Sequence, residues 1–383
     1  MKQYLSLALY VLFCGFFFFG SSHQAYLPPQ NPRLLKAYEA LQAWKHAITS
    51  DPKNITSNWY GPDVCNYNGV TCAQAPDDPH VKTVAGIDLN HAGISGSLPE
   101  ALGLLRDLAF FHINSNRFCG TIPRSFRKLR LLYELDVSNN QFTGSFPQVV
   151  IDIPALKYVD IRYNGFQGDI PTKLWDLKLD AIFINNNKFR VKFPNNIGNS
   201  PCSVLVMANN NFHGCFPTTI SKFGNNLEEL ILLNSGLTGC IPPEIGKLTS
   251  VTVFDVSSNK LIGSLPESIE DMRSLEQLNV ANNKLSGDIP ASTCSLPKLD
   301  NFTFSNNYFD SEAEICLKLS DKDDKKNCFP DRPSQRSDME CNAFLSHPVS
   351  CEATGCPAVR SPSPPPRVIT SPPPPPPTAY PPT

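Results

Sequence analysis

The sequence predicts an α/β solenoid, a fold in which one short structural unit is stacked many times. A proline recurs every 23 to 25 residues, at Pro99, Pro123, Pro147, Pro171, Pro194, Pro217, Pro242, Pro266 and Pro290. Seven residues before each proline there is a position, here called the asparagine slot, that usually holds asparagine. It does so at Asn116, Asn140, Asn164, Asn187, Asn210, Asn259 and Asn283. This period indicates stacked repeats, because one such unit cannot bury its apolar face alone.

About ten repeats fit the template L-x-x-L-x-L-x-x-N-x-L-x-G-x-I-P, between residues 84 and 310. The alternating apolar residues predict one short strand per repeat, with every second side chain in the core. The asparagine amide is expected to satisfy backbone groups where the chain turns inward. The first repeat has Ala92 in this slot, the seventh has Ser235, and the tenth, at Asn307, lacks the proline ending.

Residues 1–22 are expected to be a secretory signal peptide. Lys2 precedes an apolar run that ends in four phenylalanines, and small residues follow. A transmembrane anchor is the alternative, but the run is short for one. Residues 23–83 should then cap the solenoid, through an amphipathic helix from Arg33 to about Thr49 and through Cys65 and Cys72.

Two further segments follow the repeats. Residues 311–357 are polar and hold five cysteines, which predicts a carboxyl-terminal cap closed by disulfides. Residues 358–383 contain Ser-Pro blocks, which indicate an extended polyproline II tail.

The cysteine count and two sequons agree with export. Of the thirteen cysteines, Cys14 lies in the signal peptide, and the even remainder suits an oxidising compartment. Asn54 and Asn301 begin N-glycosylation sequons. Outside the signal peptide no apolar run approaches the ~20 residues of a membrane span. We therefore expect a secreted protein with no membrane span.

Three disulfides are predicted from position. Cys65 pairs with its neighbour Cys72, and Cys294–Cys316 bridges the last two repeats. Cys215 and Cys240 occupy the same slot in adjacent repeats, and stacked strands lie about 5 Å apart, which fits a disulfide. The other cap cysteines, Cys328, Cys341, Cys351 and Cys356, allow three connectivities.

Cys119 and Cys202 are left over. They lie four repeats apart, about 20 Å at one strand spacing per repeat, too far to bond within one solenoid. Cys202 occupies an inward slot, where a buried free thiol is expected. Cys119 occupies an outward slot, where an intermolecular disulfide, and hence a homodimer, is the alternative to a free thiol.

Catalytic and metal-binding patterns are missing from the sequence. It contains no Cys-x2-Cys, no His-x3-His, no glycine-rich phosphate loop and no nucleophile elbow. The acids of the strand surface are spread evenly, which argues against a carboxylate pair acting on a sugar. We expect no enzyme activity, no cofactor, no metal and no nucleic-acid partner.

The repeat register identifies the solvent-facing positions of the strand surface. These slots hold ten acids, namely Asp88, Glu134, Asp136, Asp160, Asp180, Glu228, Glu229, Asp255, Glu276 and Asp300, against two bases, Lys157 and Arg162. Aromatic residues cluster in the amino-terminal half of the same surface: Phe110, Tyr133, Tyr158, Tyr163 and Phe183, with His91 and His112 beside them.

Such a surface would attract a cationic partner and offer it aromatic anchors. The alternative is a solvated face with incidental aromatics. As a binding site for a basic peptide we predict Phe110, His112, Tyr133, Glu134, Asp136, Tyr158, Asp160, Arg162, Phe183, Glu228, Glu229 and Asp255.

Several of these motifs resemble a known family. The L-x-G-x-I-P repeat is similar to the plant-specific class of extracellular leucine-rich repeats, and Trp59 with Cys65-x6-Cys72 is similar to the amino-terminal cap of that class. The segment Asn327-Cys-Phe-Pro-Asp-Arg-Pro-Ser-Gln-Arg-Ser337, followed by Ser-Pro blocks, resembles the leucine-rich repeat extensins.

The resemblance implies a plant cell-wall protein that binds small, basic, cysteine-rich signalling peptides, the rapid alkalinization factors. It also implies a hydroxylated and glycosylated tail that ties into wall polymers, although this tail has only two good Ser-Pro blocks and a single Tyr380. A wall scaffold that binds such a peptide is the leading hypothesis. The alternatives are a polygalacturonase inhibitor, which would lack the cysteine segment and the tail, and a purely structural wall glycoprotein.

Overall fold

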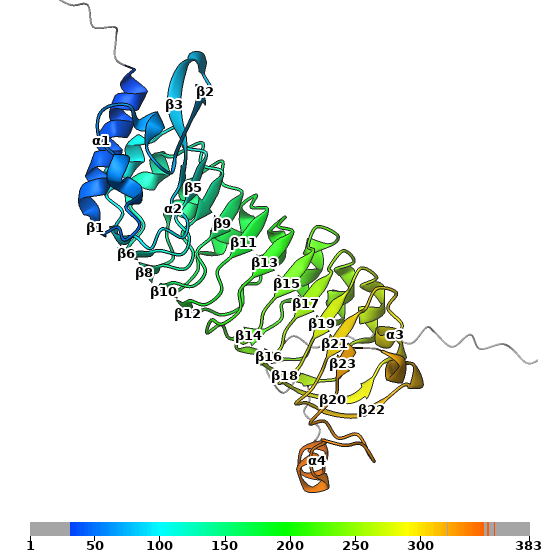
Figure 1. The fold of residues 1–383 in the computed structure, drawn as a ribbon. Coiled ribbons are helices and arrows are strands. Elements are labelled where there is room, and N and C mark those ends of the chain that lie inside the picture. The colour runs from blue at the N-terminus through cyan, green and yellow to red at the C-terminus, as the bar shows by residue number, and fades with distance from the viewer. Residues whose placement is uncertain (1–30, 320, 348–350, 352–355, 357–383) are drawn as a thin grey trace, which may run out of the picture.

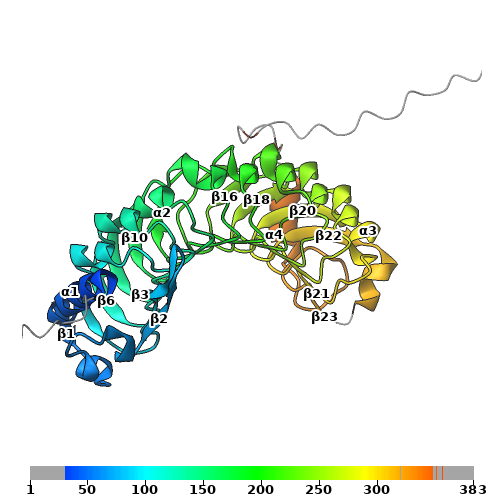
Figure 2. The same cartoon turned by 90° about the horizontal axis from the view of Figure 1, so that it is seen from above.

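The protein is a curved solenoid in a computed structural model that describes residues 31–319, 321–347, 351 and 356 (Figure 1). The signal peptide expected at residues 1–22 and the tail expected at 358–383 lie outside these residues. Seen from above, the strands of one long sheet line the inner side of the arc, and short helical turns line its outer side (Figure 2). The predicted α/β solenoid is confirmed.

The inner surface, here called the concave face, is a sheet of twelve strands within the described residues. All neighbours are parallel except the first pair, which forms an antiparallel hairpin. In the three-residue strands from β5 to β21 the middle side chain is buried, such as Leu135 of β7, whereas Lys322 in the middle of β23 is partly exposed. The strands are β2 Val70–Ala75, β3 Asp78–Asp88, β5 Phe110–His112, β7 Glu134–Asp136, β9 Tyr158–Asp160, β11 Ala181–Phe183, β13 Val204–Val206, β15 Glu229–Ile231, β17 Val253–Asp255, β19 Gln277–Asn279, β21 Asn301–Thr303 and β23 Asp321–Asp323.

Two shorter sheets, here called the flank sheets, run along the side of the solenoid. The first consists of β1 Ile48–Ser50, β4 Ser95–Ser97, β6 Arg117–Gly120, β8 Gln141–Ser145, β10 Gly165–Gly168 and β12 Lys188–Phe189. The second consists of β14 Gly214–Cys215, β16 Leu237–Gly239, β18 Lys260–Gly263, β20 Lys284–Ile289 and β22 Tyr308–Glu312.

Helical turns complete each repeat on the outer side. Most begin just after the periodic proline, because proline has a helix-compatible φ and needs no hydrogen-bond acceptor for its nitrogen. The 3₁₀ helices are η1 Ile55–Asn58, η2 Val64–Asn66, η3 Glu100–Leu104, η4 Arg124–Lys128, η5 Thr172–Asp176, η6 Ile197–Asn199, η7 Thr218–Phe223, η8 Pro243–Lys247, η9 Glu267–Asp271 and η10 Glu314–Lys318. Two repeats have a short α-helix instead, α2 Val149–Asp152 and α3 Ala291–Cys294.

The amino-terminal cap contains the predicted helix, α1 Pro32–Ala47. The side chain of Asn31 caps it by accepting hydrogen bonds from the backbone nitrogens of Arg33 and Leu34, which otherwise lack an acceptor. The buried Trp44 of this helix lies between Trp59 and the repeat residue Phe111, with ring centroids 5.7 and 5.6 Å away. Aromatic packing therefore joins the cap to the first repeats.

The slot asparagines form a ladder along the core. The Asn140 Nδ2 donates to the carbonyls of Ile113, Val137 and Ser138 at 2.9, 3.2 and 3.0 Å, and its Oδ1 accepts from the Phe118 nitrogen at 2.9 Å. One side chain thus satisfies backbone groups of two repeats. The residue before each rung has a positive φ, as at His91, Ser115, Asn139, Tyr163, Asn186, Asn209, Asn234, Ser258, Asn282, Asn306 and Lys326.

The ladder continues into the predicted carboxyl-terminal cap. Asn327 donates to the Phe304 and Asp324 carbonyls and accepts from the Phe309 nitrogen, in the same pattern as the earlier rungs. Strand β23 adds to the concave sheet beside β21. We expected the repeats to end at residue 310, but an atypical further unit follows. Leu319 and Phe329 fill two apolar slots of the template in this unit, but Lys322 and Asp324 stand at its two strand slots and the proline is missing.

The remaining cap residues cover this last unit. The Arg332 guanidinium lies 2.7 Å from the buried Glu312 carboxylate and 4.4 Å from the Phe329 ring centroid. The Arg336 Nε donates to the Asn307 carbonyl, and its guanidinium lies over the Tyr308 ring. Helix α4 Asp338–Leu345 begins at a capping box formed by Ser337 and Glu340. These contacts explain the arginines of the cysteine-rich motif.

Five disulfides join described residues, and they correct one predicted pair. Cys65–Cys72 and Cys294–Cys316 are present, and Cys328 pairs with Cys341. Cys215 and Cys240, however, do not bond to each other. They bond to Cys356 and Cys351, which follow α4 in sequence but lie at the sixth and seventh repeats. We call these two cysteines the strap.

The stagger of the second flank sheet explains the error. Cys215 pairs in register with Thr238, two residues before Cys240. A two-residue offset adds about 6.6 Å along the strand, which places the two Cα atoms about 8 Å apart, beyond the disulfide range. The sequence slots coincide, but the strands are shifted relative to each other.

The ladder predicts a large loss of stability from a single rung. Asn259 accepts from the backbone nitrogens of Ser235 and Leu237, and it donates to the carbonyls of Leu232, Val256 and Ser257. Replacement by alanine leaves buried backbone groups without partners, so Asn259→Ala should lower the free energy of unfolding by about 3 kcal/mol. Urea unfolding measures this change in the free energy of unfolding. The control is Asn226→Ala, at an exposed asparagine outside the ladder. An equal loss of stability in the two variants would contradict the role of the ladder.

Candidate functional site on the concave face

Stacking places the predicted residues in two parallel rows across the concave face. His112, Asp136, Asp160 and Phe183 occupy one row on the successive strands β5, β7, β9 and β11. Phe110, Glu134 and Tyr158 occupy the second row. Residues far apart in sequence therefore become neighbours at one strand spacing, about 4.8 Å. We call this group, together with Arg162, the acidic–aromatic cluster.

The amino-terminal side of the cluster joins aromatic and acidic groups. The Phe110 ring lies against Gly86, whose missing side chain leaves room for it. The rings of Phe110 and His112 have centroids 5.1 Å apart. The His112 Nε2 lies 3.0 Å from a Glu134 carboxylate oxygen. Tyr133, just before β7, is 47% exposed, so that its ring is accessible to a partner.

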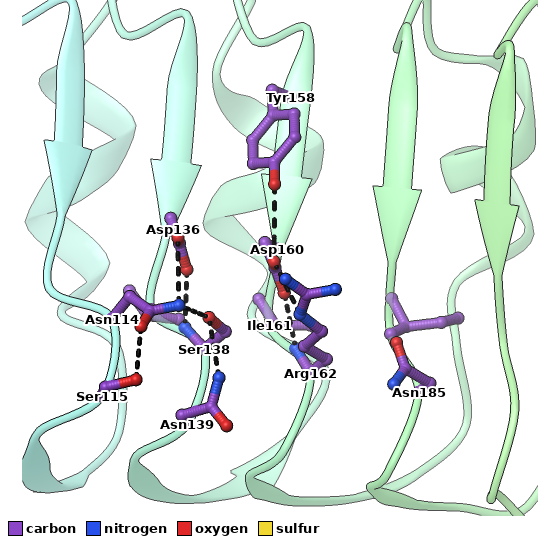
Figure 3. Close-up of polar contacts among 12 residues, drawn as sticks. Asn114, Ser115, Asp136, Ser138, Asn139, Tyr158, Asp160, Ile161, Arg162 and Asn185 are labelled. Atoms are coloured by element: carbon purple, nitrogen blue, oxygen red, sulfur yellow. Dashed lines mark hydrogen bonds and ion pairs between the residues drawn. The ribbon is translucent and has the colours of Figure 1, made fainter. Parts of the chain in front are cut away.

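The centre of the cluster contains two carboxylates on adjacent strands (Figure 3). Asp136 accepts from the Ser138 nitrogen at 2.9 Å. Asp160 accepts from the Arg162 nitrogen at 3.1 Å and is paired with the Arg162 Nε at 3.0 Å. The Tyr158 hydroxyl donates to Asp160 at 3.5 Å. Backbone and guanidinium groups thus orient both acids.

Asp160 departs from the expectation that it faces solvent, because it is 0% exposed. The Arg162 guanidinium and the Tyr158 hydroxyl contact it, and both side chains also lie against Phe183, at 5.0 and 5.5 Å from its ring centroid. Burial, together with the charge of Asp136, raises the pKa of Asp160 to about 7, against the opposing effect of Arg162. Burial also raises the pKa of the Tyr158 hydroxyl.

An apolar patch borders the cluster, and sequence reasoning missed it. Val206 and Ile231 continue the row of Phe183 on β13 and β15. Next to Arg162, the Asn185 Oδ1 is buried and has no hydrogen-bond partner within the described residues (Figure 3). The repeat register places Val206 and Ile231 at outward slots, and apolar residues at such slots are the signal from which this patch could have been predicted.

The three other predicted acids form a separate group. Glu228 and Glu229 lie at β15, and Asp255 lies in the same row as Ile231 on β17. Asp255 accepts from the Ser257 nitrogen and hydroxyl and from the Asn279 amide. The structure therefore places acids on both sides of an apolar patch, and these three residues do not join the acidic–aromatic cluster.

The remaining predicted sites lie apart from the cluster. Asn54 is exposed in a left-handed turn of the amino-terminal cap. Asn301 lies on β21, where its amide donates to Asp321. Cys119 is an exposed free thiol on β6, whereas Cys202 is a buried one whose pKa is raised by burial to about 11. Both glycosylation assignments stay predictions.

Two searches of the described residues found nothing. No helix in this part of the chain has the length and apolar character that crossing a bilayer requires. No trio of His, Cys, Asp or Glu side chains is grouped there so that it could hold a metal ion.

Comparisons with known proteins agree with this architecture. A family model described as leucine rich repeat N-terminal domain matches residues 36–73, and the leucine rich repeat model matches residues 131–151, 250–272 and 274–296. Leucine-rich repeat extensin-like protein 6 of Arabidopsis thaliana is 70% identical over 333 residues, covering 86% of this chain and 71% of that protein. Protein 4 of the same series is 62% identical, covering 88% and 68%.

Among solved structures, the chain is similar to the ectodomain of the Arabidopsis receptor kinase HAESA, crystallised with a peptide hormone ligand. The identity is 27%, the TM-score is 0.67, and the alignment covers 76% of this chain and 49% of that one. The plant peptide hormone receptor RGFR1 in complex with RGF2 is 26% identical, with a TM-score of 0.58 and coverages of 61% and 38%. The chain thus spans about half or less of these receptor ectodomains.

Asp160 predicts a pH dependence of stability. The pKa of Asp160 is about 7 in the folded protein, whereas that of an unperturbed aspartate, as in the unfolded chain, is 3.8. The folded protein therefore holds the proton of this carboxyl group more tightly. This contribution to stability is complete below about pH 4 and is lost as the pH rises through 7. The melting temperature of the wild type should therefore fall relative to that of Asp160→Asn between pH 5 and 8. Parallel melting curves for both proteins would contradict the assignment.

Proposed function

The chain belongs to the leucine-rich repeat extensin-like proteins, and from this premise we propose that it is an extracellular scaffold of the plant cell wall. Its partner on the concave face is a small, basic, cysteine-rich secreted peptide of the rapid alkalinization factor type. By holding this peptide in the wall, the protein contributes to wall organisation and growth.

The acidic–aromatic cluster carries this proposal. Glu134 and Asp136 offer carboxylates to the lysine and arginine side chains of a peptide, and Tyr133 and Phe110 beside them offer ring surface. Aromatic anchors next to complementary charges are what a tight peptide interface uses. The outward strand slots of the repeats hold ten acids against two bases, and of these acids Asp160 is buried against Arg162, so the remaining excess of negative charge also steers a cationic peptide toward this surface.

Two further features suit a peptide rather than a simple cation. Ile231, which is partly exposed beside the buried Val206, offers apolar surface to an aliphatic side chain. The unpartnered Asn185 Oδ1 can accept a hydrogen bond from a peptide N–H, which would remove the cost of leaving a buried acceptor unpaired. The solved complex of the HAESA ectodomain is a precedent for a peptide ligand on this fold.

Binding should depend on the paired carboxylates. With a basic, disulfide-bonded peptide as titrant, Glu134→Gln/Asp136→Asn should raise the dissociation constant about tenfold, because two carboxylates of the interface lose their charge. The matched control is Glu270→Gln/Asp271→Asn on η9, with the same charge change on the outer side. Isothermal titration at low and high salt provides the measurement.

The outcomes separate the alternatives. Loss of affinity with added salt in the wild type, and in the control variant alike, supports an electrostatic concave interface. Equal weakening by both double variants would contradict the concave site. An absence of binding to any basic secreted peptide at low salt would favour the purely structural role in the wall.

A disulfide-linked homodimer through Cys119 also stays a prediction. The thiol is exposed on β6, where a second chain can reach it, whereas the thiol of Cys202 is buried. A non-reducing gel of the secreted protein should show a dimer band that Cys119→Ser abolishes and Cys202→Ser retains. A monomer band alone in the wild type would rule the dimer out.

A further inference from the structure

A cationic groove lies on the outer side of the first repeats, away from the concave face. Its walls carry Arg106 from the turn after η3, Arg127 and Lys128 from η4, and Arg130 from the turn that follows. A second hollow shares Arg106 with this groove and extends it to Lys36 on α1. In Figure 1 these elements lie at the amino-terminal end of the solenoid, between α1 and α2.

The cations of the groove wall outnumber its acids by four to two. Asp107 is already engaged, since it accepts from the Arg33 guanidinium at 2.6 Å and from the Thr83 hydroxyl at 2.7 Å. Asp152 of α2 is the other acid of the groove wall. Within the described residues, Arg106, Arg127, Lys128 and Arg130 form no ion pair. All four side chains are exposed.

The groove is specific to this end of the molecule. Lys247 and Arg273 occupy the slots of Lys128 and Arg130 in later repeats, but the outer helices η8 and η9 beside them carry Glu244, Glu267, Glu270 and Asp271. On the outer helices of the first repeats, η3 carries one acid, Glu100, whose carboxylate accepts from the Arg124 and Ser125 nitrogens, and η4 carries none. The outer side is therefore predominantly cationic there and predominantly acidic at η8 and η9.

We propose that this groove binds an acidic polysaccharide whose sugar units carry carboxylates, that is, a uronic-acid polymer. Arg106 and Arg130 fill the same slot in adjacent repeats, so their positive charges recur with the repeat and match a polymer with a charge on each unit. The planar guanidinium pairs with carboxylates through two hydrogen bonds. Five disulfides indicate an oxidising compartment, which argues against a nucleic acid as the polyanion. Leu131, 40% exposed in the same wall, offers apolar contact to a sugar ring.

This site is independent of the peptide site. The concave face is acidic and the groove is basic, so the two surfaces recognise ligands of opposite charge. Binding of a wall polysaccharide by the solenoid itself would attach the protein to the wall without any contribution from the tail.

The experiment titrates the full secreted chain with an unesterified oligogalacturonate and with its fully methyl-esterified form, which has no charge. The unesterified form should bind, and its affinity should fall with added salt. Lys128→Gln/Arg130→Gln should weaken it about tenfold, because two exposed charge contacts are lost. The slot-matched Lys247→Gln/Arg273→Gln should leave it unchanged. Melting curves establish that both variants are folded.

Three results would overturn the proposal: no binding of the unesterified form, equal binding of the esterified form, or equal weakening by both double variants. Competition with inorganic polyphosphate tests the class of ligand. If polyphosphate displaces the sugar polymer only when the concentration of phosphate charges is much higher than that of carboxylate charges, the groove recognises carboxylates. Displacement by polyphosphate at equal charge would show a non-specific polyanion surface and count against it. Basic peptide affinity, measured on the same variants, should not change.

Discussion

The requirement that inward-turning backbone be hydrogen-bonded in a water-free core governs this structure. In every repeat the chain bends toward the axis at a residue with positive φ, and the buried groups next to that bend have no strand partner. One asparagine amide supplies both a donor and an acceptor, and it does so for two repeats at once, as at Asn140 and Asn283. Where Ser235 replaces it, Asn259 accepts two hydrogen bonds from that repeat instead of one.

The chemistry of both proposed surfaces depends on the spacing that this ladder imposes. Because each rung fixes the position of the strand before it, outward side chains line up in rows, and Asp136 and Asp160 become neighbours. The charge of Asp136 helps to raise the pKa of Asp160, which Arg162 and Tyr158 cover. On the outer side the same repetition places Arg106 and Arg130 in equivalent positions. In a repeat protein, each repeat thus contributes one residue at the same position to a row, and these rows form the surface.

Much of this could be predicted from the sequence, because the repeat period reports directly on local structure. The strands, the ladder and the amino-terminal helix follow from patterns within single repeats, and so do the pairs Cys65–Cys72 and Cys294–Cys316. The errors concern relations between units. The predicted Cys215–Cys240 pair was wrong because equal positions in the repeat template do not reveal the stagger between neighbouring flank strands. The burial of Asp160 depends on side chains from its own and the next strand. The Asn327 unit has polar residues at the two strand slots and no periodic proline, so the template does not identify it.

The strap determines how the solenoid carries mechanical load. Cys356 and Cys351 are bonded to Cys215 and Cys240, near the middle of the solenoid, although they follow its last strand in sequence. Tension on the chain beyond Cys356 therefore reaches the fold first at Cys215, through a covalent bond. The repeats from β18 onward lie outside this load path and cannot be peeled away one at a time from the end. Reduction of the Cys215–Cys356 bond alone would only move the point of attachment to Cys240, so both disulfides must be reduced before tension on the tail could unfold the last repeats one at a time.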